Sequence, residues 1–346
     1  MQKHNSLTVG FTYDLKSDYL ARGYSEEEAA EYDSSETIQA IQSALVQMGC
    51  TVERIGGFHS LVKKLALGQT WDLVFNICEG ERGSAREAQV PSLLEAYRIP
   101  CVFSDASVLS LTLNKSLTKS VMRDHGVATP KSWWLKDLNE LNALATIIEC
   151  DYPLFVKPAS EGSSKGIHRN SLVRTWSELK STVHQLSPIF AGGILIERYL
   201  PGREFTVGIK GNGGEAQVLG ALEILFEKEE IQEVYSYETK QNYLEIIRYR
   251  LANDATSDAV AAVALRAWQV LGCRDLGRVD IRLDEKGVPH FLEVNPLAGL
   301  HPVNSDLIIL SKHLGISYYD LISSAVNETL KRAFILRESR LTQEVS

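Results

Sequence analysis

The pattern of apolar and polar positions divides the chain into two stretches of different character. Up to residue 113, short apolar runs alternate with segments in which apolar residues recur at helical spacing. The runs predict strands at 7–11, 51–55, 72–76 and 99–103, and the spaced segments predict helices at 37–49, 58–67 and 90–97. Regular alternation of strand and helix is typical of a doubly wound parallel sheet with helices on both faces.

From residue 114 onward the pattern predicts a mixed α+β body. Helices are expected at 115–125, 175–185 and 260–271, strands at 153–157 and 194–200, and further helix after Ser305. Residues 277–284 and 290–295 alternate strictly and read as a β-hairpin. We therefore expect an α/β protein with three parts: residues 1–113, 114–200 and 201–346.

Composition indicates the general class of protein but does not identify its activity. The chain has 346 residues, 44% of them hydrophobic and 23% charged, which is typical of a globular protein. A formal charge of −8 argues against non-specific nucleic-acid binding. No apolar run is long enough for a signal peptide or a membrane span, so a cytoplasmic protein with no membrane partner is expected. Five cysteines without a CxxC pair indicate reduced, buried thiols.

The predicted hairpin carries the most specific candidate chemistry. Side chains alternate along a strand, so Arg278 and Asp280 share one face of the first strand, and Glu293 and Asn295 share one face of the second. If the strands pair, two carboxylates, an amide and a cation converge. Such oxygen ligands suit Mg²⁺ together with nucleotide phosphates. The alternative is a set of solvent-facing polar residues on an ordinary hairpin.

Candidate phosphate ligands come from three lysines and one loop. Lys115 begins a helix, Lys157 ends a buried strand and Lys240 lies in a polar loop. The loop EGSSKG (161–166) offers backbone N–H groups that could cradle a phosphate. Neither a Walker A motif nor GxGxxG after the first strand is present. Each lysine alone could equally be a surface residue, with Lys157 the least easily explained in that way.

The segment ILIERYLPGREF (194–205) could present backbone groups to a purine and a carboxylate to ribose hydroxyls. An ordinary strand-turn-strand fits it equally well. Taken in order, however, six segments resemble the ATP-grasp superfamily and its D-alanine–D-alanine ligase-like branch. They are NK (114–115), FVKPASEGSSKG (155–166), ERYLPGREFTVG (197–208), ETK (238–240), GRVDIRL (277–283) and EVNPLAGL (293–300).

The resemblance implies an ATP-grasp fold, in which an N-terminal doubly wound α/β domain precedes two α+β subdomains that sandwich ATP. It implies nucleotide-binding roles for Lys115, Lys157, Ser163, Ser164, Glu197, Tyr199, Leu200, Glu204 and Lys240. Glu197, with the backbone near Tyr199 and Leu200, would hold adenine, and Glu204 the ribose. Two Mg²⁺ ions, or Mn²⁺, would be bound by Asp280, Glu293 and Asn295. Catalytic roles would fall to Arg278, Ser163, Gly299 and Lys240, and the assembly would be a homodimer.

The substrate end departs from the family pattern. The family's HGxxGEDG segment corresponds to NICEGERGSAREAQ (76–89), which places Glu79 near the usual histidine. Gln241 follows Lys240 where tyrosine is usual, and Asn304 stands roughly where a serine grips the second substrate. We therefore expect Glu79, Gln241, His301 and Asn304 to face substrate. Glu79 favours a cationic or amine-bearing ligand. Tyr32, Asp33 or Ser34 of the long acidic loop 15–35 are further candidates for substrate contact.

The expected function is an ATP-dependent carbon–nitrogen ligase for small amino-acid-like substrates that releases ADP and phosphate. A carboxylate would be activated as an acyl phosphate and attacked by an amine. Classical D-alanine–D-alanine synthesis is one alternative. Condensation of an amino acid with mycosporine-glycine to give an imine, with an enolised ketone oxygen as the activated group, is another. A nucleotide-binding protein without catalysis and a carboxylase-type ATP-grasp subunit are further alternatives, although nothing in the sequence suggests the carrier domain that the latter would need.

Overall fold

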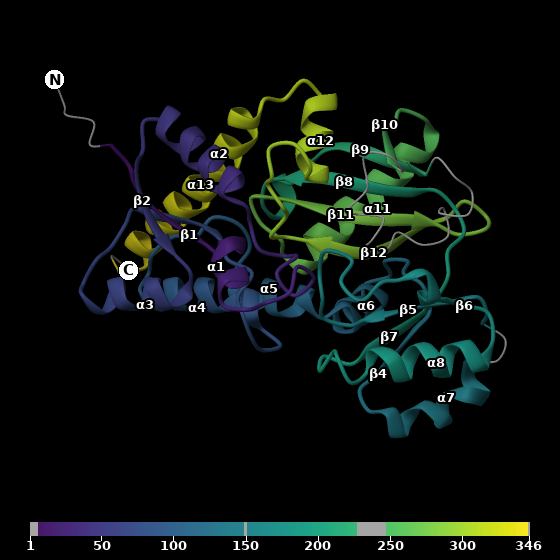
Figure 1. The fold of residues 1–346 in the computed structure, drawn as a ribbon. Helices are drawn as coiled ribbons and strands as arrows, with labels where there is room; N and C mark the ends of the chain where they lie inside the picture. Colours follow the sequence, from purple (N-terminus) through teal and green to yellow (C-terminus); the bar gives the residue numbers. More distant parts are fainter. Residues whose placement is uncertain (1–5, 149–150, 227–246, 345–346) are drawn as a thin grey trace.

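Three sheets, each with its own helices, make up the chain in the computed structural model (Figure 1), which describes residues 6–148, 151–226 and 247–344. A parallel sheet is formed by β1 (Thr8–Tyr13), β2 (Thr51–Gly56) and β3 (Leu73–Ile77) in the order β2-β1-β3. The sheet predicted from alternating strands and helices in the first stretch is thereby confirmed, as are its first three strands.

Helices cover both faces of this parallel sheet. On one face, α2 (Ser35–Gln47) packs against β1 and β3 through Ile38, Ile41 and Leu45. On the other, α3 (Phe58–Ala66) and α4 (Gln89–Ala96) enclose Val74 and Trp71. Apolar burial on both faces explains why β3 is apolar at almost every position. The short α1 (Lys16–Ala21) and α5 (Ala106–Leu113), by contrast, had no clear signal in the sequence.

The strand predicted at 99–103 was wrong. This stretch makes only an isolated bridge, in which Cys101 lies beside Val74 and the backbone of residues 100 and 102 bonds to Val74. Phe103 then adopts a left-handed backbone with φ 76° and buries its ring against Phe75. The apolar run therefore reflects burial at the edge of the sheet, and the turn at Phe103 prevents a longer ladder.

The middle of the chain forms a four-stranded antiparallel sheet in the order β4-β7-β5-β6. Its strands are β4 (Ser132–Leu135), β5 (Leu154–Pro158), β6 (Leu172–Val173) and β7 (Ile194–Arg198). Helices α7 (Leu141–Ile148) and α8 (Trp176–Leu186) close its core, and α6 (Lys115–Asp124) leads into it. Figure 1 shows α7 and α8 on the side of this sheet that lies away from the rest of the molecule.

A five-stranded antiparallel sheet in the order β10-β9-β8-β11-β12 follows. It contains β8 (Glu204–Lys210), β9 (Gln217–Phe226), β10 (Ile247–Leu251), β11 (Leu276–Leu283) and β12 (Pro289–Asn295). The helix α11 (Ala255–Leu271) covers one face through Val260, Ala264 and Trp268. Gly277 is needed here, because a Cβ would lie 2.7 Å from the Trp268 ring.

The last two helices return to the first sheet. The helices α12 (Asp306–His313) and α13 (Tyr318–Glu344) share a core with β1, β3 and α2, and Figure 1 shows α13 beside α2. Asp275, fully buried at the start of β11, accepts hydrogen bonds from Arg332, Thr329 and the Phe103 N–H. No helix in the described ranges is long and apolar enough to span a membrane.

Candidate active site

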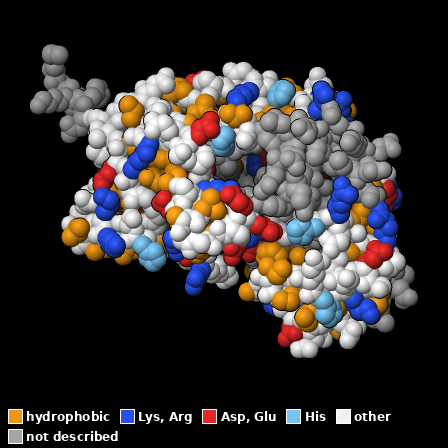
Figure 2. Space-filling model, in the orientation of Figure 1, with side chains coloured by type: hydrophobic (Ala, Val, Ile, Leu, Met, Phe, Trp, Pro, Cys, Tyr) orange, Lys and Arg blue, Asp and Glu red, His pale blue; other side chains and the backbone are white. Residues whose placement is uncertain are grey.

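Two cavities meet where the three sheets converge. The larger, of about 470 Å³, lies between the parallel sheet and the end of β12, and the smaller, of about 110 Å³, lies between the two antiparallel sheets. Four residues line both: Ser163, Arg278, Glu293 and Asp306. All sixteen predicted site residues within the described ranges line one cavity or the other. Figure 2 shows acidic side chains gathered near the middle of the visible face.

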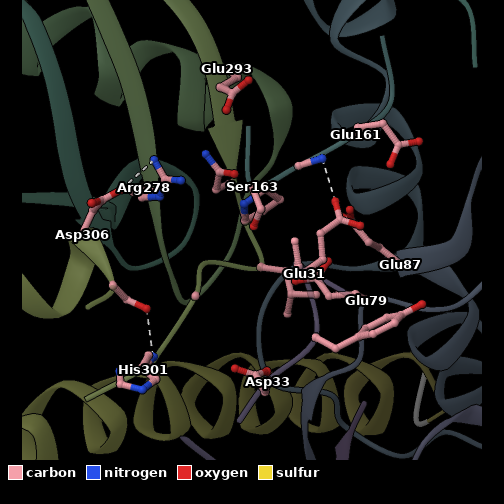
Figure 3. A pocket seen from close by; sticks show the side chains of 18 of the residues that line it. Glu31, Asp33, Glu79, Glu87, Glu161, Ser163, Arg278, Glu293, His301 and Asp306 are labelled. Atoms are coloured by element: carbon pink, nitrogen blue, oxygen red, sulfur yellow. Dashed lines mark hydrogen bonds and ion pairs between the residues drawn. The ribbon is translucent and has the colours of Figure 1, made fainter. Parts of the chain in front are cut away.

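The hairpin of β11 and β12 brings its four polar groups together as its alternation predicted. Arg278 pairs with Asn295 and Asp280 pairs with Glu293 across the antiparallel strands. The Arg278 Nη1 donates to Asp280 Oδ1 at 2.6 Å and lies 3.6 Å from Asp306 Oδ2 (Figure 3). The alternate residues Val279, Ile281 and Val294 are buried in the core. The reading as an ordinary solvent-facing hairpin therefore fails.

The two carboxyl groups of this hairpin have pKa values shifted in opposite directions. Burial raises the pKa of Asp280; Arg278 opposes that shift and Glu293 adds to it. For Glu293, burial acts to raise the pKa, but Lys115, Lys157 and Arg278 outweigh it and hold the pKa below its usual range. A cation between the two carboxylates would relieve the repulsion that Glu293 exerts on Asp280.

The oxygen donors at the hairpin fit Mg²⁺. Asn295 Nδ2 donates to Asp280 Oδ2 at 3.1 Å. The amide oxygen of Asn295 is therefore left available to a metal ion. Within the described ranges no three or more His, Cys, Asp or Glu side chains form a metal cluster. The protein thus offers two carboxylates and an amide, the partial set that Mg²⁺ completes with nucleotide phosphates and water.

A buried lysine that the sequence reading missed accompanies Lys157. Glu197, itself buried, places Oε1 2.7 Å from Lys157 Nζ and Oε2 2.9 Å from Lys119 Nζ. Burial lowers the pKa of Lys119 to about 8, while Glu197 acts to raise it. The spacing from Lys115 to Lys119 is one helical turn, so both lie on one face of α6, and that was the available signal. Adenine binding by Glu197 stays a prediction.

A second missed residue, Arg86, ties the serine loop (residues 160–166) to the part of the chain that carries the parallel sheet. Ser163 and Ser164 adopt left-handed φ of 50° and 59°. Arg86 Nη2 contacts both carboxylate oxygens of Glu31 at 3.1 Å, and its Nη1 donates to the Ser160 carbonyl at 3.0 Å. Glu31 in turn accepts from the Gly162 N–H at 2.6 Å. The polar stretch 80–86 gave no sign that Arg86 would be buried.

The smaller cavity has the predicted base-binding residues in its wall. Tyr199, Leu200 and Glu204 line it, together with Lys157 and Glu197. Arg282, which sequence reasoning did not single out, donates from Nη1 to Glu204 at 2.9 Å and from Nη2 to the Tyr199 hydroxyl at 3.2 Å. Its alternation with Arg278 and Asp280 along β11 places it on the same face, and this spacing could have identified it.

The larger cavity collects the residues expected near substrate. Glu79, Gly299, His301 and Asn304 all line it, as do Tyr32, Asp33 and Ser34. His301 Nδ1 accepts from the Val303 and Asn304 N–H groups, and its Nε2 lies 3.5 Å from Glu36 Oε2. In the described part of the chain the Gly299 N–H makes no hydrogen bond. Lys240 and Gln241 lie outside the described residues.

Comparison with known proteins identifies the family. Residues 122–327 match the family model described as D-ala D-ala ligase C-terminus. A D-alanine–D-alanine ligase of Bordetella petrii is 31% identical over 293 residues, which cover 84% of this chain and 85% of that protein. One of Xanthomonas axonopodis is 30% identical over 84% of this chain and 88% of its own length.

Solved structures show the same fold. The Bacillus anthracis D-alanine–D-alanine ligase complexed with ATP superposes with a TM-score of 0.70 at 21% identity, over 95% of this chain and 99% of that one. The chain therefore belongs to the D-alanine–D-alanine ligase family of the ATP-grasp fold and is an ATP-dependent, ADP-forming carbon–nitrogen ligase.

Proposed function

We propose that this enzyme transfers the γ-phosphoryl group of ATP to the carboxylate of a small amino-acid-like substrate and then joins the activated acid to an amine. The observation that carries this proposal is the wall shared by the two cavities. Ser163, Arg278, Glu293 and Asp306 line both. A nucleotide in the smaller cavity and an acid in the larger one would therefore meet at these residues.

The nucleotide would bind with its base and ribose near Tyr199, Leu200 and Glu204 and its phosphates near the lysines. Glu197 holds Lys157 in place. Burial lowers the pKa of Lys157, but Glu197, Glu293 and Glu204 together outweigh it and keep the pKa above its ordinary value. Lys157 is thus a fixed positive charge beside the nucleotide. Lys115, 3.5 Å from Glu293, extends this positive region toward the larger cavity.

Asp280, Glu293 and Asn295 are the residues that would hold Mg²⁺. The bound ion would supply positive charge to the nucleotide phosphates. Arg278 stays protonated beside it, because burial lowers its pKa less than Asp280, Asp306 and Glu293 raise it. A guanidinium with fixed partners stabilises charge that develops on transferred phosphoryl oxygens without having to reorganise.

In the first step, a carboxylate oxygen of the substrate forms a bond to the γ-phosphorus, the bond to the ADP oxygen breaks, and an acyl phosphate results. In the second, the amine attacks the acyl carbon, phosphate leaves with the bonding electron pair, and the amine loses a proton. The Gly299 N–H and Arg278 are the donors available to the oxyanion at the cavity wall. The serine loop, closed over the shared wall, would exclude water from the acyl phosphate.

A coupled assay of ADP release tests the proposal. The purified enzyme is supplied with ATP, Mg²⁺ and pairs of D- or L-amino acids, with and without mycosporine-glycine as an enolisable partner. We expect ADP and phosphate in equal amounts, formed only when both the acid or enolisable partner and the amine are present. Release of AMP and pyrophosphate during productive turnover would overturn the proposal.

A further inference from the structure

The wall of the larger cavity carries more carboxyl groups than cationic side chains. Five carboxyl groups lie on this wall, around the part of the chain that carries the parallel sheet and the serine loop: Glu31, Asp33, Glu79, Glu87 and Glu161. Figure 3 shows Glu31, Glu79, Glu87 and Glu161 gathered on one side of the cavity, across from Arg278 and Asp306. The cavity is large enough for a small substrate beside these groups.

Two of these carboxylates are already neutralised by protein cations. Arg86 binds both oxygens of Glu31 and lies 3.7 Å from Glu161, which also pairs with Lys165 at 3.2 Å. The side chains of Arg86 and Glu31 are only 9% and 8% exposed. Glu31 also accepts from the Gly162 N–H. With its oxygens committed to the guanidinium and to this N–H, Glu31 has little left for a substrate cation.

The other three carboxyls have no ion pair within the described ranges. The side chains of Glu79 and Glu87 make no hydrogen bond or salt bridge there, although the charge of Arg86 acts on both to lower their pKa values. Asp33 has no cationic partner. Burial raises the pKa of Glu79, and Glu87 is the largest of the charges that add to this rise. Burial raises the pKa of Asp33 to about 7. Burial disfavours the ionised form of a carboxyl group, and a nearby cation restores the stability of that form.

We propose that the substrate bound against Glu79 and Glu87 carries two cationic amino groups, as in a diamino acid. The proposal rests on the function proposed above and names its substrate class. The ammonium group of a neutral amino acid would balance one carboxylate and leave the second of the pair without a partner. A second ammonium group would balance the charge of the second carboxylate. Asp33, on the wall of the same cavity, is close enough to attract the substrate's ammonium groups electrostatically.

Matched substrate pairs test this assignment on the intact enzyme. 2,3-Diaminopropionate is compared with serine, and ornithine with norvaline, because each pair differs by one amino group at nearly equal size. For ADP release we expect kcat/KM to be at least about 10-fold higher for the diamino acid, the effect of about 1.4 kcal/mol. Calorimetric Kd values with a non-hydrolysable ATP analogue give the same comparison without turnover.

Substitutions test whether Glu79 and Glu87 cause the preference for a diamino substrate. Glu79→Gln and Glu87→Gln should each reduce the ratio between the diamino and the neutral substrate toward one, while Glu215→Gln, an equal charge change at an exposed position far from the cavity, should leave it unchanged. Equal kcat/KM and equal Kd for the matched pairs in the natural protein would overturn the inference. A diamino preference in Kd without any ADP release would instead uphold the inference and overturn the proposed function.

Discussion

Asp280 and Glu293 lie opposite each other across the β11–β12 pair, one with its pKa raised and the other with its pKa lowered. The two carboxyls share one polar hairpin face, yet only Glu293 is surrounded mainly by cations. This asymmetry leaves Asp280 in need of further positive charge, and a nucleotide-bound metal ion would provide it.

Removing either hairpin carboxylate should abolish ligation. For Glu293→Gln and Asp280→Asn we expect ADP release to fall at least about 100-fold, because charge stabilisation at the phosphoryl group is lost. Circular dichroism and thermal unfolding check that each variant folds. Glu285→Gln, which changes an exposed carboxylate at the hairpin turn, is the matched control and should keep normal activity. Normal turnover in Glu293→Gln would remove the metal assignment.

A side chain at Gly162 should disturb the serine loop. A Cβ there would lie 2.7 Å from Glu31 Oε1, so Gly162→Ala must displace either the loop or the Glu31 carboxylate that Arg86 and the Gly162 N–H hold in place. We expect a several-fold rise in KM for ATP and ADP release that exceeds product formation, because water reaches the acyl phosphate. Gly214→Ala meets nothing within 4 Å and serves as the control. Tight coupling of ADP to product in Gly162→Ala would contradict a closing role for this loop.

Lys119 should contribute to stability through its buried ion pair. Lys119→Met leaves one oxygen of buried Glu197 without its cation, and we expect the free energy of unfolding to fall by about 2 kcal/mol. Lys131→Met breaks an exposed pair with Asp151 and should cost about 0–1 kcal/mol. Denaturant titration measures both. Equal, small losses would show that Glu197 is satisfied by Lys157 alone.

Ionisation of Asp33 should lower the free energy of unfolding as the pH rises. Its pKa is raised from 3.8 to about 7 in the folded protein, mainly by burial. Between these values the folded state binds more protons than the unfolded state, so stability present below pH 4 is lost as the pH rises through 7. Asp33→Asn should therefore raise the free energy of unfolding at pH 8 by about 1–3 kcal/mol and have little effect at pH 4.

Exposed Asp124 provides the control for this pH dependence, since Asp124→Asn removes a carboxyl that is 85% exposed. Unfolding free energies at the two pH values, measured without substrate, decide the matter. If Asp33→Asn behaves as Asp124→Asn does at both, the carboxyl of Asp33 is not strained by burial.

The sequence predicted the polar face of the hairpin but not the buried cations that pair with Glu31 and Glu197. Strand alternation alone placed Arg278, Asp280, Glu293 and Asn295 on one hairpin face, because the period of two is a local property. No such pattern marked Arg86, and the helical spacing from Lys115 was the only signal for Lys119. Their partners, Glu31 and Glu197, lie 55 and 78 positions away in the chain, so only the fold brings them together.

The strand prediction at 99–103 failed for a similar reason. The apolar run indicates that these residues are buried, but whether they pair along a neighbouring strand depends on the tertiary fold, and here only Cys101 forms a bridge, with Val74. The homodimer, the cytoplasmic location and the roles of Lys240 and Gln241 stay predictions from the sequence.

The fate of the carboxylate oxygens tests the central claim most directly. An amino acid that supports ADP release is labelled with oxygen-18 in its carboxyl group, and the released phosphate is analysed by mass spectrometry. Activation through an acyl phosphate predicts that one labelled oxygen passes from the carboxyl group to each phosphate formed with product. Phosphate that carries no label, while product forms normally, would contradict the account.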